Sequence, residues 1–181
     1  MNGEKLLLNM DLSIAERRFA ANLILENQDL LDELIVFINK NESKLALLAL
    51  RAIEVLAQSH FEIIHKFIPE LIHSGKLYSD SSSRRCLAKI YGFAIKENSN
   101  KISGFKLTSE LKKEIIELSF LWLISIEKTA VKVFSMQNIY DLKMEEHWIA
   151  QELIGVIEKE FPNSSQGFKP RAIKILRKLR E

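Results

Sequence analysis

Residues 43–74 read SKLALLALRAIEVLAQSHFEIIHKFIPELIHS, and this stretch decides the fold. The first half is apolar nearly all round the helical period, which is typical of a helix that other elements cover on two sides. The second half has apolar residues at three-and-four spacing and stops at Ser74-Gly75, a good C-terminal signal. We predict helices over 43–58 and 61–74, with a kink or short break near His65 because Pro69 removes one backbone hydrogen bond.

Helical patterns continue on both sides of this pair. Ser13 and Glu16 form a capping box, and the serines after Asp80 and the Thr108-Ser109 pair offer further N-caps. The predicted helices span 13–26, 29–40, 43–58, 61–74, 82–97, 109–126, 127–142, 145–160 and 165–180. With 6 Gly and 3 Pro in 181 residues, the chain lacks the turn residues of a strand-rich fold. We predict one all-α domain over residues 1–181.

Composition narrows the class of protein. Hydrophobic residues make up 47% and charged residues 28% of the chain, which is ordinary for a globular protein. Cys86 is the only cysteine, so an intramolecular disulfide is excluded, and a lone thiol suits a reducing compartment. The densest apolar run, 120–126, is far shorter than the roughly 20 residues of a membrane span. We expect a cytoplasmic protein without a membrane span.

Two kinds of internal similarity suggest repeats. A shift of 84 residues places Lys44, Ala46 and Leu47 on Lys128, Ala130 and Val131. An Ala-rich helix alternates with a Leu/Ile-rich helix that carries a proline, as in FIPEL at 67–71. This alternation resembles HEAT repeats, in which each helix pair must stack on the next to bury its apolar faces. The resemblance implies an α-α superhelix of stacked antiparallel helix pairs, of the HEAT/armadillo type.

A second resemblance is to a family of short, uncharacterised bacterial proteins, some of which are labelled adenylosuccinate lyase. It rests on RFAANL at 18–23, KTAVKVFSM at 128–136 and GFKPRA at 167–172, and covers most of the chain. Lyases of that superfamily carry a flexible Ser-Ser-x-Met-Pro-x-Lys-x-Asn loop. The nearest string, SMQN at 135–138, lies in a predicted helix and lacks the Pro and Lys. We therefore expect no lyase activity.

Residues that could carry chemistry are few. The chain has no HExxH motif, Gly-rich phosphate loop or nucleophile elbow. The histidines are His60, His65, His73 and His147; on the predicted helix 61–74, His65 and His73 are eight residues apart, which is too wide for one metal ion without a partner helix. Cys86 is either a low-pKa thiol beside Arg85 or a buried packing residue. We expect a non-catalytic protein without cofactor or metal.

The charges divide between the two helices of each pair. The first helices of the pairs, 13–26, 43–58, 82–97 and 127–142, together with 165–180, carry a net charge of +10. The second helices, 29–40, 61–74, 109–126 and 145–160, carry −8. In HEAT-like solenoids the second helices line the concave face, so this surface would be acidic and would suit a basic protein segment. A slip of the pairing by one helix would make the groove basic. The candidate partner-binding residues are Asp29, Asp32, Glu33, Glu62, Glu70, Glu146, Trp148 and Glu152.

The last predicted helix is strongly basic. Its candidate anion contacts are Lys169, Arg171, Lys174, Arg177 and Lys178. They form either a phosphate-binding surface or the solvated end cap of a repeat array. The leading hypothesis is a scaffold that binds another protein. The alternative is a nucleic-acid-binding protein related to HEAT-like alkylpurine DNA glycosylases, to which Trp148 beside Glu152 is a loose parallel.

Overall fold

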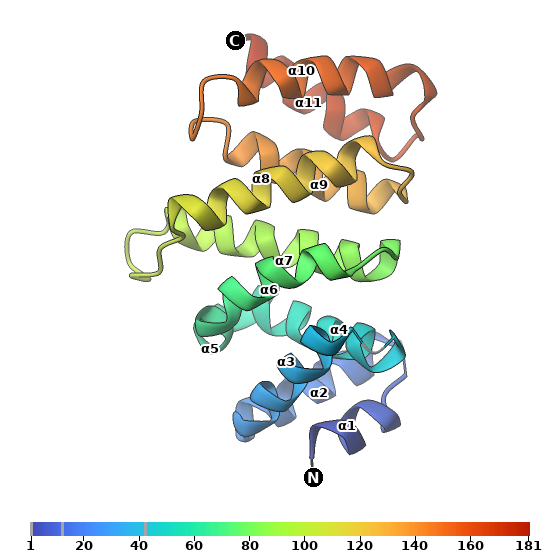
Figure 1. Ribbon diagram of the computed structural model, residues 1–181, viewed down its shortest axis with the longest axis vertical. Coiled ribbons are helices and arrows are strands. Elements are labelled where there is room, and N and C mark those ends of the chain that lie inside the picture. The colour runs from blue at the N-terminus through green and yellow to red at the C-terminus, as the bar shows by residue number, and fades with distance from the viewer. Residues whose placement is uncertain (1, 12, 42) are drawn as a thin grey trace. The chain divides into compact units, whose positions relative to one another are not determined.

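The computed structural model describes residues 2–11, 13–41 and 43–181, and within these ranges the regular structure is helical, without strands (Figure 1). The all-α prediction is confirmed. The chain divides into two compact units, unit 1 ending at Lys106 and unit 2 spanning Leu107–Glu181.

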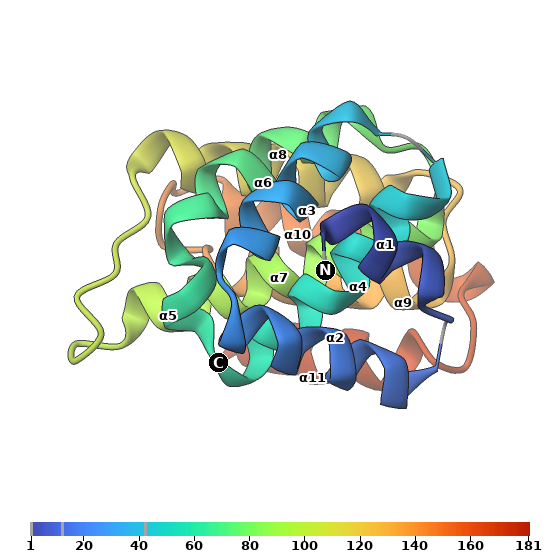
Figure 2. The ribbon, with the colours of Figure 1, turned by 90° about the horizontal axis from the view of Figure 1, so that it is seen from below.

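Unit 1 has two groups of helices that contact one another. Its helices are α1 (Gly3–Asn9), α2 (Ile14–Glu26), α3 (Asp29–Lys40), α4 (Ser43–Ser59), α5 (Phe61–Ile64), α6 (Ile68–Ser74) and α7 (Ser81–Ser99). The first helices of the predicted pairs in unit 1 are α2, α4 and α7, and they are neighbours, because α4 contacts both α2 and α7 (Figure 1, Figure 2). The second helices are also neighbours, because α3 contacts α6.

The predicted break near His65 is confirmed. A 3-10 turn, His65–Phe67, separates α5 from α6, and the backbone N–H of Ile68 donates to the carbonyl of His65. Pro69 lies in the first turn of α6, where a missing N–H costs nothing because that group has no intrahelical partner. The proline therefore begins a new helix after the break.

The short helix α1 was not predicted. Asn2 caps it by accepting from the backbone N–H of Lys5 at 2.9 Å, and its buried side chains are Leu6 and Leu7. Gly3 lies so close to α3 that an added Cβ would come within 2.9 Å of the Cβ of Glu33. A seven-residue helix has too little apolar pattern for recognition, and α1 is held by packing on α3 and α4.

Helix α7 begins at a strong cap. The carboxylate of Asp80 accepts from the backbone N–H groups of Ser82 and Ser83 at 3.0 and 2.9 Å. Replacement of Asp80 by alanine leaves these amides without that acceptor, so we expect the free energy of unfolding in urea to fall by about 1 kcal/mol. Asp80→Asn keeps an acceptor and serves as the control. Equal losses in the two variants would contradict the capping role.

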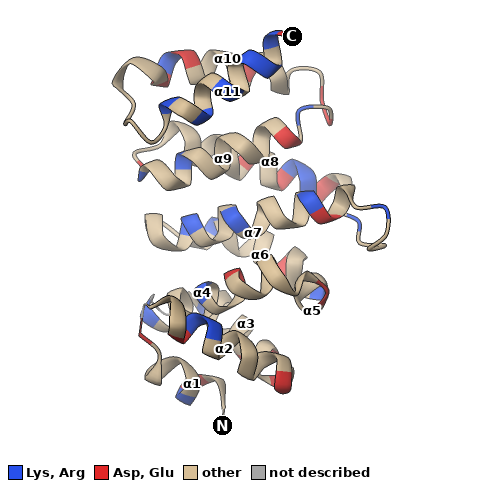
Figure 3. Ribbon diagram, turned by 180° about the vertical axis from the view of Figure 1, so that it is seen from behind, with Lys and Arg blue, Asp and Glu red and all other residues tan. Residues whose placement is uncertain are grey.

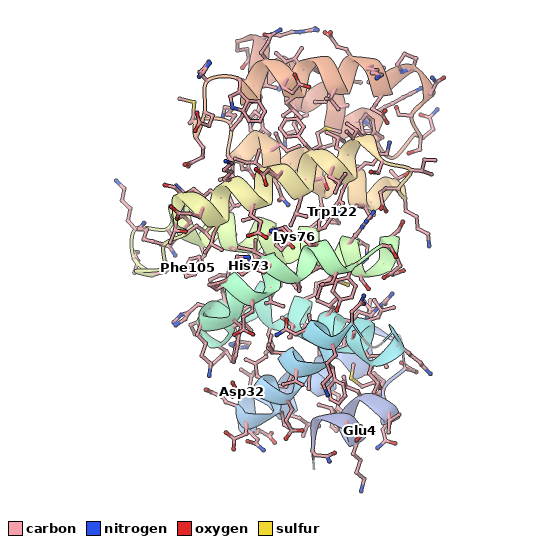
Figure 4. The ribbon with its side chains drawn as sticks, viewed as in Figure 1. Glu4, Asp32, His73, Lys76, Phe105 and Trp122 are labelled. Atoms are coloured by element: carbon pink, nitrogen blue, oxygen red, sulfur yellow. The ribbon has the colours of Figure 1, made fainter. Side chains whose placement is uncertain are left out.

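Unit 2 contains α8 (Ser109–Ile124), α9 (Thr129–Asp141), α10 (Ile149–Glu160) and α11 (Lys169–Arg180). Helix α9 contacts all three others, and the fully buried indole of Trp122 comes from α8 (Figure 4). The predicted start of the last helix at 165 was early by four residues. Pro170, in the first turn of α11, favours a helix start there.

The helix predicted over 145–160 likewise begins later in the structure than predicted, at Ile149. Its buried positions are Ile149, Leu153 and Ile157, at a spacing of four. Residues 144–148 are all exposed, so no core contact holds them in a helix, and they form turns instead.

Candidate functional site

An exposed tryptophan marks a groove in unit 2. The Trp148 side chain, in the residue before α10, is 45% exposed and lines a groove of about 720 Å³ together with residues of α8. Its indole stacks on Phe120 of α8, with ring centroids 5.8 Å apart and an angle of 29° between the rings. Because Phe120 supports one face of the indole, the ring is held in place while nearly half of the side chain meets solvent. We call this the Trp148 groove.

The Trp148 groove is acidic. Its charged lining residues are Glu110, Glu117, Glu145 and Glu146, with Lys112 and Lys113. The ammonium group of Lys112 lies 2.8 Å from the carboxylate of Glu145, so this pair is neutralised. The side chain of Glu146 has no hydrogen-bond or ion-pair partner in the part of the chain that the structure describes. A groove with excess carboxylates beside an indole suits a Lys or Arg side chain, which the carboxylates attract and the ring face can accept.

Three of the predicted partner-binding residues lie in or beside this groove. Glu146 and Trp148 both line it, although both precede α10 rather than lying on it. Glu152 lies one helical turn further, where its backbone N–H donates to the carbonyl of Trp148 at 3.0 Å. Its carboxylate is exposed and has no ion-pair partner within the described ranges.

The sequence did not predict that residues of α8 line the Trp148 groove. Glu110, Lys112 and Glu117 line the groove, but Lys112 and Glu145 are 33 residues apart. Local periodicity gives no indication that these two segments meet. The run of charges at 110–117 was the only available signal, and its spacing is equally typical of a solvated helix face.

Two of the predicted partner-binding carboxylates in unit 1, Asp32 and Glu70, make contacts between α3 and the 61–74 segment. Asp32 projects from α3 (Figure 4), and its carboxylate lies 3.6 Å from the ammonium group of Lys66 in the 3-10 turn. Glu70 of α6 accepts a hydrogen bond of 3.2 Å from the side chain of Asn39 on α3. These carboxylates are exposed, but both already take part in contacts between α3 and the 61–74 segment.

The three remaining predicted partner-binding residues are Glu33, Glu62 and Asp29. Glu33 accepts from the backbone N–H of Gly3, so it joins α1 to α3 and has a structural role. Glu62 lies 3.5 Å from Nδ1 of His60. Asp29 is exposed in the first turn of α3, where a carboxylate is favourable to the helix dipole.

Most of the predicted anion contacts on α11 touch other groups of unit 2. The contacts join Arg171 to Gln137, Arg177 to Glu181, Lys169 to the ring of Phe161 and Lys178 to the ring of Tyr140. Lys174 is exposed and makes no such contact within the described ranges. These contacts hold the basic side chains along unit 2.

The lone thiol is a packing residue. Cys86 is fully buried, and burial raises the pKa of its thiol to about 12. The alternative of a low-pKa thiol beside Arg85 is therefore wrong, although Arg85 does donate to its sulfur at 3.3 Å. Across the described ranges, His, Cys, Asp and Glu side chains do not gather in groups of three that could hold a metal ion.

Comparison with known proteins finds no matching family model, no matching curated protein and no matching solved structure. The resemblances to HEAT repeats and to the short bacterial proteins therefore stay predictions. None of the helices in the described residues has the length and apolar character needed to cross a membrane.

Proposed function

We propose that the protein is a non-catalytic, HEAT-like interaction module that binds a basic segment of another protein in the Trp148 groove. The observation that carries this proposal is the combination of an exposed, supported indole with excess carboxylates in one groove. Glu146 and Trp148 provide the main contacts, and Glu152 extends the acidic surface by one helical turn. Binding depends on charge and shape complementarity and involves no chemical step.

The arrangement of the helices supports the same proposal. In unit 1 the first helices contact one another and the second helices contact one another, as the repeats of a solenoid do. The second helices of unit 1 are acidic, with a net charge of −2 over the predicted range 29–40 and −1 over 61–74. A surface with this charge attracts basic segments and repels the phosphates of nucleic acids.

The proposal predicts a loss of binding on charge reversal. A short synthetic peptide rich in lysine and leucine is titrated into the protein by calorimetry, with a glutamate-for-lysine peptide as comparison. The double variant Glu146→Lys, Glu152→Lys is expected to bind the basic peptide about tenfold more weakly or worse, because two attractive charges become repulsive. Its melting temperature is expected to stay unchanged, since both side chains are exposed and unpaired in the described structure.

The matched control is Glu4→Lys with Glu26→Lys, which changes the net charge equally at exposed positions of unit 1. It is expected to bind the peptide like the wild type. Equal losses in the two double variants would mean that only net charge matters, and full binding by Glu146→Lys, Glu152→Lys would exclude the groove. Tight binding of duplex DNA that falls steeply with salt would favour the nucleic-acid alternative instead.

A further inference from the structure

A buried ion cluster joins α4 to α7 in unit 1. The carboxylate of Glu54 belongs to a residue that is only 6% exposed, and it accepts from both terminal nitrogens of Arg85, at 2.9 and 3.3 Å. The ammonium group of Lys89 lies 2.5 Å from the same carboxylate. One negative charge thus faces two positive charges, and the cluster alone carries an excess of one cation.

More positive charge surrounds this cluster. Arg51 lies one helical turn before Glu54, and its buried Nε–H has no acceptor within the described ranges. Burial, with the nearby charge of Arg17, lowers the pKa of the Arg51 guanidinium. Figure 3 shows Lys and Arg along α7 and on α2 and α4. The local field is therefore positive, and an anion would be favourable here.

A pocket of about 550 Å³ opens beside the cluster, between α2, α4 and α7. Its cationic lining residues are Arg17, Arg18 and Lys89, and Glu54 is the one carboxylate among the residues that line it. Asn22 and Gln58 add neutral hydrogen-bond donors, and the hydroxyl of Ser59, which also lines the pocket, donates to the carbonyl of Val55 at 2.9 Å.

His60 and four apolar side chains complete the pocket wall. Ile14, Ala21, Leu25 and Val55 line it beside the donors. A pocket of this size, with an apolar wall and a few convergent polar groups, is typical of small-molecule sites. Bare inorganic anions would use the cations alone and leave the apolar wall without a contact.

We propose that this α2–α4–α7 pocket binds a small phosphate-bearing molecule, with the phosphate held by Arg18 and Lys89 and an apolar or ring-shaped body against the aliphatic wall. A phosphate offers several acceptor oxygens to the forked guanidinium donors, which makes it a better match than a single hydroxyl or carbonyl. The pocket lies in unit 1, whereas the Trp148 groove lies in unit 2. The two sites are therefore separate, and this proposal does not depend on the function proposed for the groove.

Calorimetric titration of the full chain at low ionic strength tests the proposal. Adenosine monophosphate, adenosine and inorganic pyrophosphate are the probes, because they separate the phosphate from the apolar body. We expect adenosine monophosphate to bind about tenfold more tightly than adenosine or pyrophosphate. Equal binding of adenosine and adenosine monophosphate, or no binding of any phosphate probe, would overturn the proposal.

Arg18→Gln is the informative variant, since the Arg18 side chain is exposed and its loss leaves the Glu54 cluster intact. It is expected to bind adenosine monophosphate about tenfold more weakly, with an unchanged melting temperature. Lys44→Gln removes one charge from α4 outside the pocket and is expected to bind like the wild type. Unchanged affinity in Arg18→Gln, or equal loss in both variants, would exclude this site, as would tight binding of a duplex oligonucleotide that adenosine monophosphate does not displace.

Discussion

Trp122→Ala is expected to lower the free energy of unfolding by about 4 kcal/mol. The indole of Trp122 is fully buried in unit 2, where it is the largest fully buried side chain of the described residues. Truncation removes its apolar contacts and leaves a cavity that the surrounding helices fill only in part. Urea unfolding followed by far-ultraviolet circular dichroism measures the loss, and Trp122→Phe is expected to fall between the wild type and the alanine variant.

Trp148→Ala provides the matched control. Both changes remove the same atoms, but the Trp148 side chain is 45% exposed and its main ring contact is the stack on Phe120. Its loss is expected to cost under about 1.5 kcal/mol. If the two alanine variants unfold at the same urea concentration, the assignment of Trp122 to the core and of Trp148 to the surface is wrong.

Glu54→Ala is expected to cost about 3 kcal/mol, because it leaves Arg85 and Lys89 partly buried without their carboxylate. Their side chains are only 24% and 22% exposed, so solvent compensates them in part. Glu26→Ala, at an exposed position of α2, is the control and is expected to change stability by less than about 0.5 kcal/mol. A loss for Glu54→Ala as small as that of the control would mean that the ion cluster contributes little.

The contribution of Glu54 to the free energy of unfolding also depends on pH. Burial raises the pKa of its carboxyl, but the hydrogen bond from Lys89 and the charge of Arg85 outweigh burial and hold the pKa below its ordinary value of 4.5. A lowered folded-state pKa stabilises the fold above the unfolded pKa, and this contribution is lost as the pH falls through the folded pKa. The difference between wild type and Glu54→Ala should be full at neutral pH and shrink below about pH 4. A difference that grows in acid would contradict this sign.

Apolar periodicity was enough to predict most of the helices. It located the residues that form α2, α3 and α4, and Pro69 indicated the break before α6. These features depend on neighbours within one or two helical turns, so they are visible in a single sequence.

The sites depend on contacts between distant residues, and these were not predictable. The Glu54 carboxylate meets Arg85 and Lys89, which are 31 and 35 residues away in the chain. Glu54 was not singled out because a lone glutamate in an apolar helix has no distinctive local pattern. The Trp148 groove was predicted in part, since Glu146 and Trp148 were candidates, but its α8 wall depends on a long-range contact.

The placement of the two indoles provides a built-in reporter of unfolding. Trp122 and Trp148 are the only tryptophans of the chain, and both belong to unit 2. Tryptophan fluorescence therefore follows the melting of residues 107–181 alone, whereas circular dichroism follows the helices of both units. Coincident transitions by the two signals would mean that the units unfold as one cooperative body, and separate transitions would give each unit its own stability.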